Sequence, residues 1–413
     1  MTTLAELDLP YLPMETAAFA EDPFPFVAEA RKQHPWLGKC AFGYVVHGHT
    51  AIGELLRKGE PLVPSFDQVV ELLGATDMEW GRFQHVQLLN LSGDAHTRIR
   101  EIVAPLFTPA AANRNRELMR STMLQVMDEW ASREHFDFEE FVSYFPVTVM
   151  CALIGADPEV LPRIRSSLEA LGLAFGLNPD FMPEVERAHL VMDDFVHELV
   201  AGRRANPRVG STPDLLDTLL AVTGDGGLSE REVHDLLIFL FVAGYDTSKN
   251  VLTFAMHALL NRPEIYQRCA EDIAYCRTVV TETLRFHSPA TITRLVGEDF
   301  SYRDVTFSRG DMLFFPVSIS GRDPASFENP DEFLPEREGR ERHTAFGLGG
   351  HICLGQFIAR AQIEEGLHLI AQRLKNPRLA GEVGHRPFFG VWGLRGMPLE
   401  FEDAGSPSLR DAS

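Results

Sequence analysis

The most informative stretch of the chain is Phe346-Gly347-Leu348-Gly349-Gly350-His351-Ile352-Cys353-Leu354-Gly355, which sets one cysteine among four glycines. Glycine adopts left-handed and otherwise strained conformations at little steric cost, so this loop can turn tightly and approach another group closely. Apolar residues then recur at mostly helical spacing, namely Phe357, Ala361, Ile363, Leu367, Ile370 and Leu374. Cys353 therefore precedes a helix amino terminus, whose free N–H groups and dipole stabilise a thiolate. The alternative, an inert buried cysteine, has no need of a glycine-rich loop.

The composition is that of an ordinary globular protein with a large core. Of 413 residues, 45% are hydrophobic and 23% charged, and 38 basic against 59 acidic residues give a net charge of −21. Nucleic acids and anionic membranes call for a basic surface, so this balance disfavours both as partners. No internal repeat or low-complexity linker divides the chain. We expect one domain over residues 1–402 and a flexible tail over residues 403–413.

The first residues and the cysteines indicate a cellular compartment. The stretch Met1-Thr2-Thr3-Leu4-Ala5-Glu6 has neither a basic start nor a continuous apolar run, so we expect no signal peptide and no membrane anchor. Five cysteines are an odd number, and no C-x-x-C pair occurs among them. This pattern favours neither disulfides nor a structural zinc site. A cytoplasmic protein is expected.

Hydrophobic periodicity predicts a mainly α fold with small β-sheets, in the α+β class. A short strand is expected at residues 44–47 and a helix at 51–56, and residues from about 97 to 280 are helical by their apolar spacing. Short aromatic or β-branched runs at 300–302, 305–307 and 312–315 predict further strands.

One helix is expected to be long and buried. Ser229 and Glu232 form a capping-box pattern before the apolar run Leu236–Val242, and the helix can continue to about Asn261. Asp235 and Asp246 interrupt the apolar run too closely for a membrane span. Within this helix lies Ala243-Gly244-Tyr245-Asp246-Thr247, where helix propensity alone would not favour a glycine, an acid and a hydroxyl. The alternative for Thr247 is a hydrogen bond to the carbonyl of residue 243.

Two further pairs have helical spacing. Glu282 and Arg285 are three residues apart and can form an ion pair, although a surface pair of this kind is common and weak. His96 and Arg100 are four residues apart and share a helix face.

Together these motifs resemble those of the cytochromes P450. The loop matches the pattern Phe-Gly-x-Gly-x-x-x-Cys-x-Gly, the long helix carries an Ala/Gly-Gly-x-Asp/Glu-Thr stretch, and Glu282-x-x-Arg285 follows in the expected order. The resemblance implies a triangular, mainly helical P450 catalytic domain around a buried haem b, with Cys353 as the iron ligand. It also implies haem contacts from Phe346, Gly347, Gly355 and Ala243. A thiolate ligand donates electron density to haem iron, as the P450s themselves illustrate.

The same resemblance assigns further roles. Gly244 leaves room for dioxygen, Thr247 donates a hydrogen bond during oxygen activation, and Asp246 relays protons from solvent. Four basic side chains are expected to hold the haem propionates, which are costly to bury unpaired: His96, Arg100, Arg294 and His351. Glu282 and Arg285 form a structural pair that Arg322 or Arg337 completes, although Gly321 stands where the family usually has asparagine.

Position relative to these motifs predicts an apolar substrate pocket. Its expected residues are Phe239, Val242, Ala243, Ala290, Thr291, Ile292, Phe388, Phe389 and Val391, with Thr291 as the polar one. We expect hydroxylation of a small hydrophobic molecule, similar to a terpenoid or an aromatic hydrocarbon. The alternative is an acidic substrate held by Arg82 or His85.

The resemblance also implies O2 as co-substrate and electrons from NAD(P)H through a ferredoxin reductase and a ferredoxin. Arg98, Arg337, Arg340, Arg342 and Arg360 surround the cysteine-side motifs and are expected to attract an acidic ferredoxin. A monomer is expected. Two alternatives remain open, a haem-thiolate protein that uses peroxide and a haem gas sensor without turnover. The Asp246–Thr247 pair disfavours the first, and the absence of a visible signalling module disfavours the second.

Overall fold

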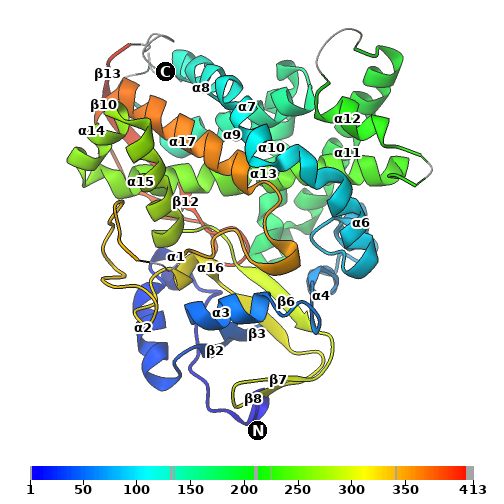
Figure 1. Cartoon of the computed structure of the whole chain (residues 1–413), viewed down its shortest axis with the longest axis vertical. Helices are drawn as coiled ribbons and strands as arrows, with labels where there is room; N and C mark the ends of the chain where they lie inside the picture. Colours follow the sequence, from blue (N-terminus) through cyan, green and yellow to red (C-terminus); the bar gives the residue numbers. More distant parts are fainter. Residues whose placement is uncertain are drawn as a thin grey trace.

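The computed structural model describes residues 2–130, 133, 135–208, 213–224, 226–339 and 342–405. A large helical part lies above a smaller part that is rich in strands and contains the N-terminus (Figure 1). The helices are α1 (Ala17–Glu21), α2 (Phe24–Gln33), α3 (His49–Leu56), α4 (Phe66–Leu72), α5 (Glu79–Val86), α6 (Gly93–Val103), α7 (Pro109–Arg114), α8 (Arg116–Trp130), α9 (Phe138–Ile154), α10 (Leu161–Leu171), α11 (Met182–Ala205), α12 (Leu215–Ala221), α13 (Glu230–Leu260), α14 (Pro263–Glu271), α15 (Ile273–Phe286), α16 (Val317–Ser320) and α17 (Gln356–Arg373).

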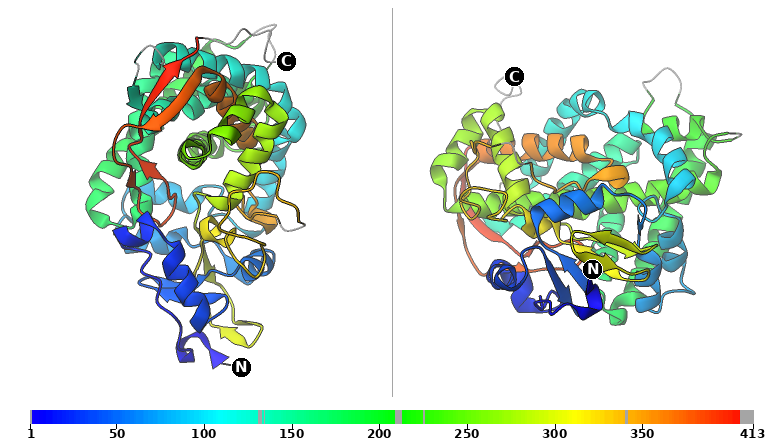
Figure 2. Two further views of the ribbon diagram at one scale, coloured as in Figure 1. Left: turned by 90° about the vertical axis from the view of Figure 1, so that its left-hand side faces the viewer. Right: turned by 60° about the horizontal axis from the view of Figure 1, so that its bottom comes forward.

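The long helix α13 forms the centre of the helical part. It begins with the predicted capping box, in which the Ser229 hydroxyl accepts a hydrogen bond from the Glu232 N–H and the Glu232 carboxylate accepts one from the Ser229 N–H. Helices α9, α11, α15 and α17 pack against it. The view along its axis in Figure 2 shows it enclosed by these elements. Its apolar residues are buried on nearly all sides, which is why the sequence lacks a polar stripe.

The strands form small sheets at the edges of the helical part. The strands are β1 (Thr2–Thr3), β2 (Leu37–Cys40), β3 (Gly43–Val46), β4 (Leu62–Val63), β5 (His135–Asp137), β6 (Ile292–Val296), β7 (Phe300–Tyr302), β8 (Val305–Phe307), β9 (Met312–Phe315), β10 (Leu374–Leu379), β11 (Gly384–His385), β12 (Leu394–Arg395) and β13 (Pro398–Asp403). The largest sheet has the order β2-β3-β9-β6-β4. It joins strands between residues 37 and 63 to strands between residues 292 and 315, and it places β6 in its interior.

Two features differ from the sequence-based expectation. Strand β5 interrupts the segment that was predicted to be helical, because it pairs with β13 from the far end of the chain. Asp403 was predicted to lie in a flexible tail but pairs with Leu374 in the β10–β13 ladder. The remaining residues 406–413 of that tail lie outside the described part. Among the described residues, no helix is long and apolar enough to cross a membrane.

Candidate active site

The cysteine loop is closed by backbone hydrogen bonds and depends on its glycines. Gly347 and Gly349 have φ values of +67° and +75°, a region that residues with side chains rarely adopt. A Cβ atom at Gly349 would lie 2.4 Å from the Leu56 carbonyl oxygen, so only glycine fits there. The Cys353 N–H donates to the Phe346 carbonyl at 2.8 Å. The loop therefore holds Cys353 in a fixed position three residues before α17.

Cys353 differs from the other cysteines in its surroundings. Cys40, Cys151, Cys269 and Cys276 are buried, whereas Cys353 retains accessible surface. Burial nevertheless raises the pKa of its thiol, while the Gly355 N–H and the Arg100 guanidinium oppose that rise. The residue is therefore only partly buried, although its thiol group is enclosed by the protein.

Four residues in the otherwise buried middle of α13 keep some accessible surface. Val242, Ala243, Gly244 and Thr247 are half-buried, although their neighbours Phe241, Tyr245 and Ser248 are buried. The four residues lie at the predicted oxygen-binding stretch. Helix α17, which follows the cysteine loop, packs against α13.

Four basic side chains gather beside the cysteine loop. The His96 and His351 ring centroids are 4.1 Å apart, and the Arg100 guanidinium donates to the Ile352 carbonyl at 2.5 Å. Arg294 lies on β6, next to Ile292, whose side chain would be 3.1 Å from a Cβ atom at Gly347. The structure thus brings together all four residues that were predicted to hold propionates.

No carboxylate neutralises this basic cluster within the described part of the chain. Arg100 and Arg294 donate only to backbone carbonyls, and the His96 Nε2 atom is buried without a hydrogen-bond partner. Burial, and then the charges of Arg294, His96 and Arg100, lower the pKa of His351 to about 3. Burial lowers the pKa of Arg294 to about 10. The two arginines therefore lack an anionic partner, and the pKa values of both neighbouring histidines are lowered. This arrangement fits the two propionates of a haem, which would supply the missing negative charge.

The structure shows which groups Thr247 and Gly244 contact, which the sequence could not decide. The Thr247 hydroxyl donates to the Ala243 carbonyl at 3.0 Å, which is the alternative considered for this residue. Its oxygen keeps lone pairs that can still accept a hydrogen bond. A Cβ atom at Gly244 would lie 3.3 Å from the Met150 sulfur on α9. Gly244 therefore lets α13 and α9 approach, and its predicted role of leaving room for dioxygen stays a prediction.

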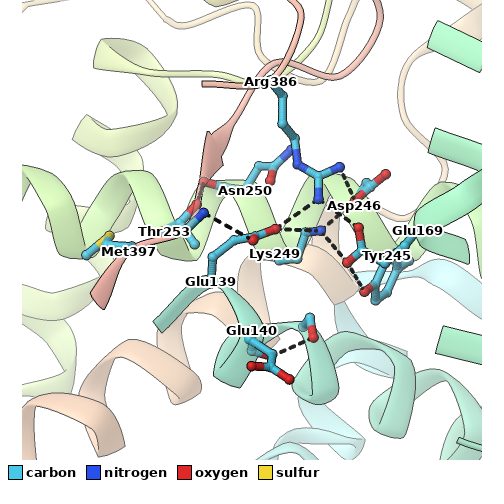
Figure 3. A network of polar contacts seen from close by, with 12 residues as sticks. Glu139, Glu140, Glu169, Tyr245, Asp246, Lys249, Asn250, Thr253, Arg386 and Met397 are labelled. Carbon is cyan, nitrogen blue, oxygen red and sulfur yellow. Dashed lines mark hydrogen bonds and ion pairs between the residues drawn. The ribbon is translucent and has the colours of Figure 1, made fainter. Parts of the chain in front are cut away.

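Asp246 belongs to a buried network of charged groups, which Figure 3 shows. Its carboxylate lies 2.9 Å from the Lys249 ammonium and 3.4 Å from the Arg386 guanidinium. Lys249 is fully buried and also contacts Glu169 at 2.8 Å and Glu139 at 3.0 Å. Arg386 bridges the same two glutamates. Three carboxylates thus share two cations.

Sequence reasoning missed four members of this network, Glu139, Glu169, Lys249 and Arg386. Lys249 could have been predicted from the sequence, because it follows Asp246 by three residues in an apolar helix, which is the spacing of an ion pair. The others come from α9, α10 and the segment between β11 and β12, and no sequence spacing connects them.

The Glu282–Arg285 pair is buried, with the two side chains 2.7 Å apart. Arg337 approaches Glu282 at 3.4 Å, whereas Arg322 contacts His287 and lies over the Phe286 ring. Arg337 is therefore the arginine that joins the pair. Because it is bound there, it is poorly placed to contact a ferredoxin, the second role predicted for it. A Cβ atom at Gly321 would lie 1.9 Å from the Arg285 carbonyl oxygen, which accounts for glycine at that position.

The predicted pocket residues divide into two groups. Val242, Ala243, Ala290, Thr291, Ile292 and Val391 are half-buried, and the Thr291 hydroxyl has no hydrogen-bond partner. Phe239 is buried with 6% of its surface exposed. Phe388 and Phe389 are buried among other rings, Phe388 against Phe19 and Phe389 against Phe314. These two phenylalanines pack in the core, contrary to the expectation that they line the pocket.

The two residues considered for binding an acidic substrate already have carboxylate partners. Arg82 contacts Asp235 at 3.1 Å, and His85 contacts Asp67 at 2.7 Å. Neither residue supports the acidic-substrate alternative.

A loop-held, half-buried cysteine with a basic cluster beside it is the arrangement that the sequence predicted for a haem-thiolate site. Comparison with known proteins agrees. Residues 170–377 match the cytochrome P450 family. The luteothin monooxygenase of Streptomyces thioluteus is 31% identical, over 95% of this chain and 96% of the relative. The pentalenic acid synthase of Streptomyces avermitilis is 30% identical, over 86% of each chain. The structure of cytochrome P450 CYP109Q5 from Chondromyces apiculatus superimposes with a TM-score of 0.83 at 23% identity, over 96% of this chain and all of that one.

The chain therefore belongs to the cytochrome P450 family, and it is a monooxygenase of the bacterial type. Membership implies haem iron, O2 and electrons derived from NAD(P)H.

Proposed function

We propose that Cys353 is the thiolate ligand of the haem iron and that His96, Arg100, Arg294 and His351 hold the propionates. The observation that carries this proposal is the basic cluster beside a half-buried cysteine, with no carboxylate partner among the described residues. The haem, when bound, supplies the iron at which O2 is reduced. Phe346, Gly347, Gly355 and Ala243 belong to the segments that would contact it.

Haem retention tests the basic cluster. In Arg100→Leu and Arg294→Leu, loss of haem to an excess of a haem-scavenging protein should be several-fold faster than in the wild type, because a propionate loses its charged partner. Arg98→Leu is the matched control, since Arg98 lies on the same helix but pairs with Glu232. Equal rates of haem loss in all four proteins would refute the assignment.

Protons for oxygen reduction are proposed to pass through Asp246. The Glu169 side chain is 30% exposed and contacts Lys249, which in turn contacts Asp246. The network therefore leads from solvent to α13. Asp246 adjoins Thr247 in the sequence, and the Thr247 hydroxyl borders the accessible surface of α13. Proton supply at this point favours substrate oxidation over release of peroxide. Hence the peroxide-using alternative is not favoured.

The substrate is proposed to be a small, neutral, largely hydrocarbon molecule that is hydroxylated. The half-buried residues beside the site are Val242, Ala290, Ile292 and Val391, all uncharged, and the unpartnered Thr291 hydroxyl offers one polar contact. A panel of a terpenoid, an alkylbenzene and a fatty acid can be titrated against the ferric protein, with displacement of water from the iron followed by absorbance. Binding of the acid alone would contradict the proposal.

Electrons are proposed to come from an acidic ferredoxin and its reductase. Of the predicted docking arginines, Arg342 is exposed, whereas Arg360 contacts His343 and Thr281. Arg98 is paired with Glu232, and Arg340 lies outside the described residues. Arg342 is therefore the best-placed member of the predicted group. A gas sensor would need no such donor, so NADH oxidation with a ferredoxin system separates the two functions.

A further inference from the structure

A second cluster of ligand-type side chains lies away from Cys353, where α11 crosses the start of α13. Asp193 and His197 are one helical turn apart on α11, and His234 faces them from α13. One ligand atom from each residue lies within 4.8 Å of the other two. The two helices pack against each other and are both labelled in Figure 1.

The distances within this cluster are close to those of a metal site. The His197 Nδ1 atom lies 2.9 Å from the His234 Nε2 atom and 3.3 Å from an oxygen of Asp193. Two donor atoms on a tetrahedral Zn²⁺ ion, each about 2.1 Å from it, are about 3.4 Å apart. The two distances from the His197 Nδ1 atom thus lie within about half an ångström of that value. The remaining pair of ligand atoms lies within 4.8 Å.

His234 carries an unsatisfied polar atom at this point. The residue is 6% exposed, and its Nδ1 atom is buried without a hydrogen-bond partner. Carboxylate oxygens of Asp193 and Asp235 lie 3.7 and 4.0 Å from that atom. A histidine that binds a metal through one ring nitrogen commonly donates the other N–H to a carboxylate. Both oxygens are beyond hydrogen-bond distance here, so His234 offers an unpartnered Nδ1 atom close to two carboxylates.

The arginine nearest to the cluster has another partner. Arg231 lies 3.6 Å from Asp193 but 3.1 Å from Asp235, which Arg82 also contacts. Arg231 can thus stay paired with Asp235 when a cation binds Asp193.

We propose that Asp193, His197 and His234 bind one Zn²⁺ ion, with water as the fourth ligand, and so link α11 to α13. Two imidazoles and one carboxylate are a donor set that suits zinc, and three protein ligands leave one position open. When the ion binds, the hydrogen between the two imidazole nitrogens moves to the far nitrogen of its own ring, so that both ligating nitrogens are unprotonated.

Zinc titration of the tag-free, haem-loaded, chelator-treated protein tests this site. Calorimetry should show one Zn²⁺ ion per chain in the wild type and binding weakened about tenfold or more in His197→Ala and Asp193→Asn. His85→Ala is the matched control, because His85 also pairs with an aspartate but has no third ligand. Wild-type affinity no higher than that of His197→Ala, or equal weakening in His85→Ala, would overturn the proposal.

Thermal unfolding gives an independent measurement, because a ligand that binds only the folded state raises its melting temperature. His197 is largely exposed, so its replacement should leave the metal-free protein folded, which the melting temperature without zinc checks. Added Zn²⁺ should raise the melting temperature of the wild type and of His85→Ala, but not that of His197→Ala. No rise in the wild type would contradict the site.

Discussion

At the scale of single residues, Thr247 is the side chain whose role is most sharply testable. Its hydroxyl donates to the Ala243 carbonyl, yet the residue remains half-buried beside Ala243 and Gly244. If it positions protons for oxygen reduction, Thr247→Ala should consume NADH and O2 at similar rates but release several-fold more peroxide per NADH. Thr247→Ser keeps the hydroxyl and should restore coupling. If Thr247→Ala formed as much product per NADH as the wild type, the hydroxyl would have only a structural role, the hydrogen bond to Ala243.

The residues of the haem site were predictable from sequence to different extents. Cys353 could be singled out because a local pattern of glycines carries the information, and its role as the iron ligand stays a prediction. The members of the charged network could not, since Lys249, Glu169 and Arg386 meet only when α10, α13 and the β11–β12 segment pack together. Phe388 was assigned to the pocket because an aromatic residue suits both a pocket and a core, and only packing distinguishes the two.

At the scale of elements, α13 depends on its buried lysine. Lys249 is fully buried and contacts three carboxylates, so its removal leaves Arg386 as the one cation of the described network. Lys249→Met should lower the free energy of unfolding by about 3–5 kcal/mol, the usual cost of breaking a buried ion pair. Urea denaturation followed by far-UV circular dichroism measures this.

A second substitution checks the electrostatic reason for that loss. Adding Glu169→Gln to Lys249→Met should recover part of the lost stability, because one uncompensated carboxylate is removed. If the double variant is less stable than the sum of the single effects predicts, the network is not held together by charge.

Element boundaries were predictable where local chemistry sets them. The capping box at Ser229 and the proline at position 263 define α13, and the structure places its ends at Glu230 and Leu260. Strand β5 was missed because its three residues pair with β13, more than two hundred and fifty residues away, and carry no local turn signal. Long-range pairing of this kind cannot be inferred from a single short segment.

At the scale of the whole molecule, the charged network predicts how stability depends on pH. Burial opposes ionisation of Glu169, but Lys249 and Arg386 outweigh it and lower the pKa of Glu169 to about 2, from 4.5. Its contribution to stability is therefore complete above pH 4.5 and is lost as the pH falls from there toward 2. The melting temperature of Glu169→Gln should fall less steeply than that of the wild type over this interval.

The control for that experiment is Glu101→Gln, which alters an exposed glutamate with no ion pair in the described part of the chain. Its melting curve should follow the wild type at every pH. Parallel curves for the wild type and Glu169→Gln would show that Glu169 is not held ionised by the network.

The net charge of −21 makes local basic groups important for electron transfer. If an acidic ferredoxin docks near Arg342, Arg342→Glu should slow ferredoxin-driven reduction several-fold at low ionic strength, and the difference should shrink as salt is added. Reduction by dithionite should be unaffected. A ferredoxin-driven rate that is independent of both the substitution and salt would place the docking surface elsewhere.

Cys353 is proposed to ligate the haem iron. The carbon monoxide difference spectrum of the reduced protein measures this ligation directly. The wild type and Cys40→Ser should both show the red-shifted Soret band of a thiolate-ligated ferrous carbonyl complex. Cys353→Ser should lose that band while keeping its far-UV circular dichroism spectrum. If Cys353→Ser retained the thiolate band, another residue would ligate the iron and the assignment of Cys353 would be wrong.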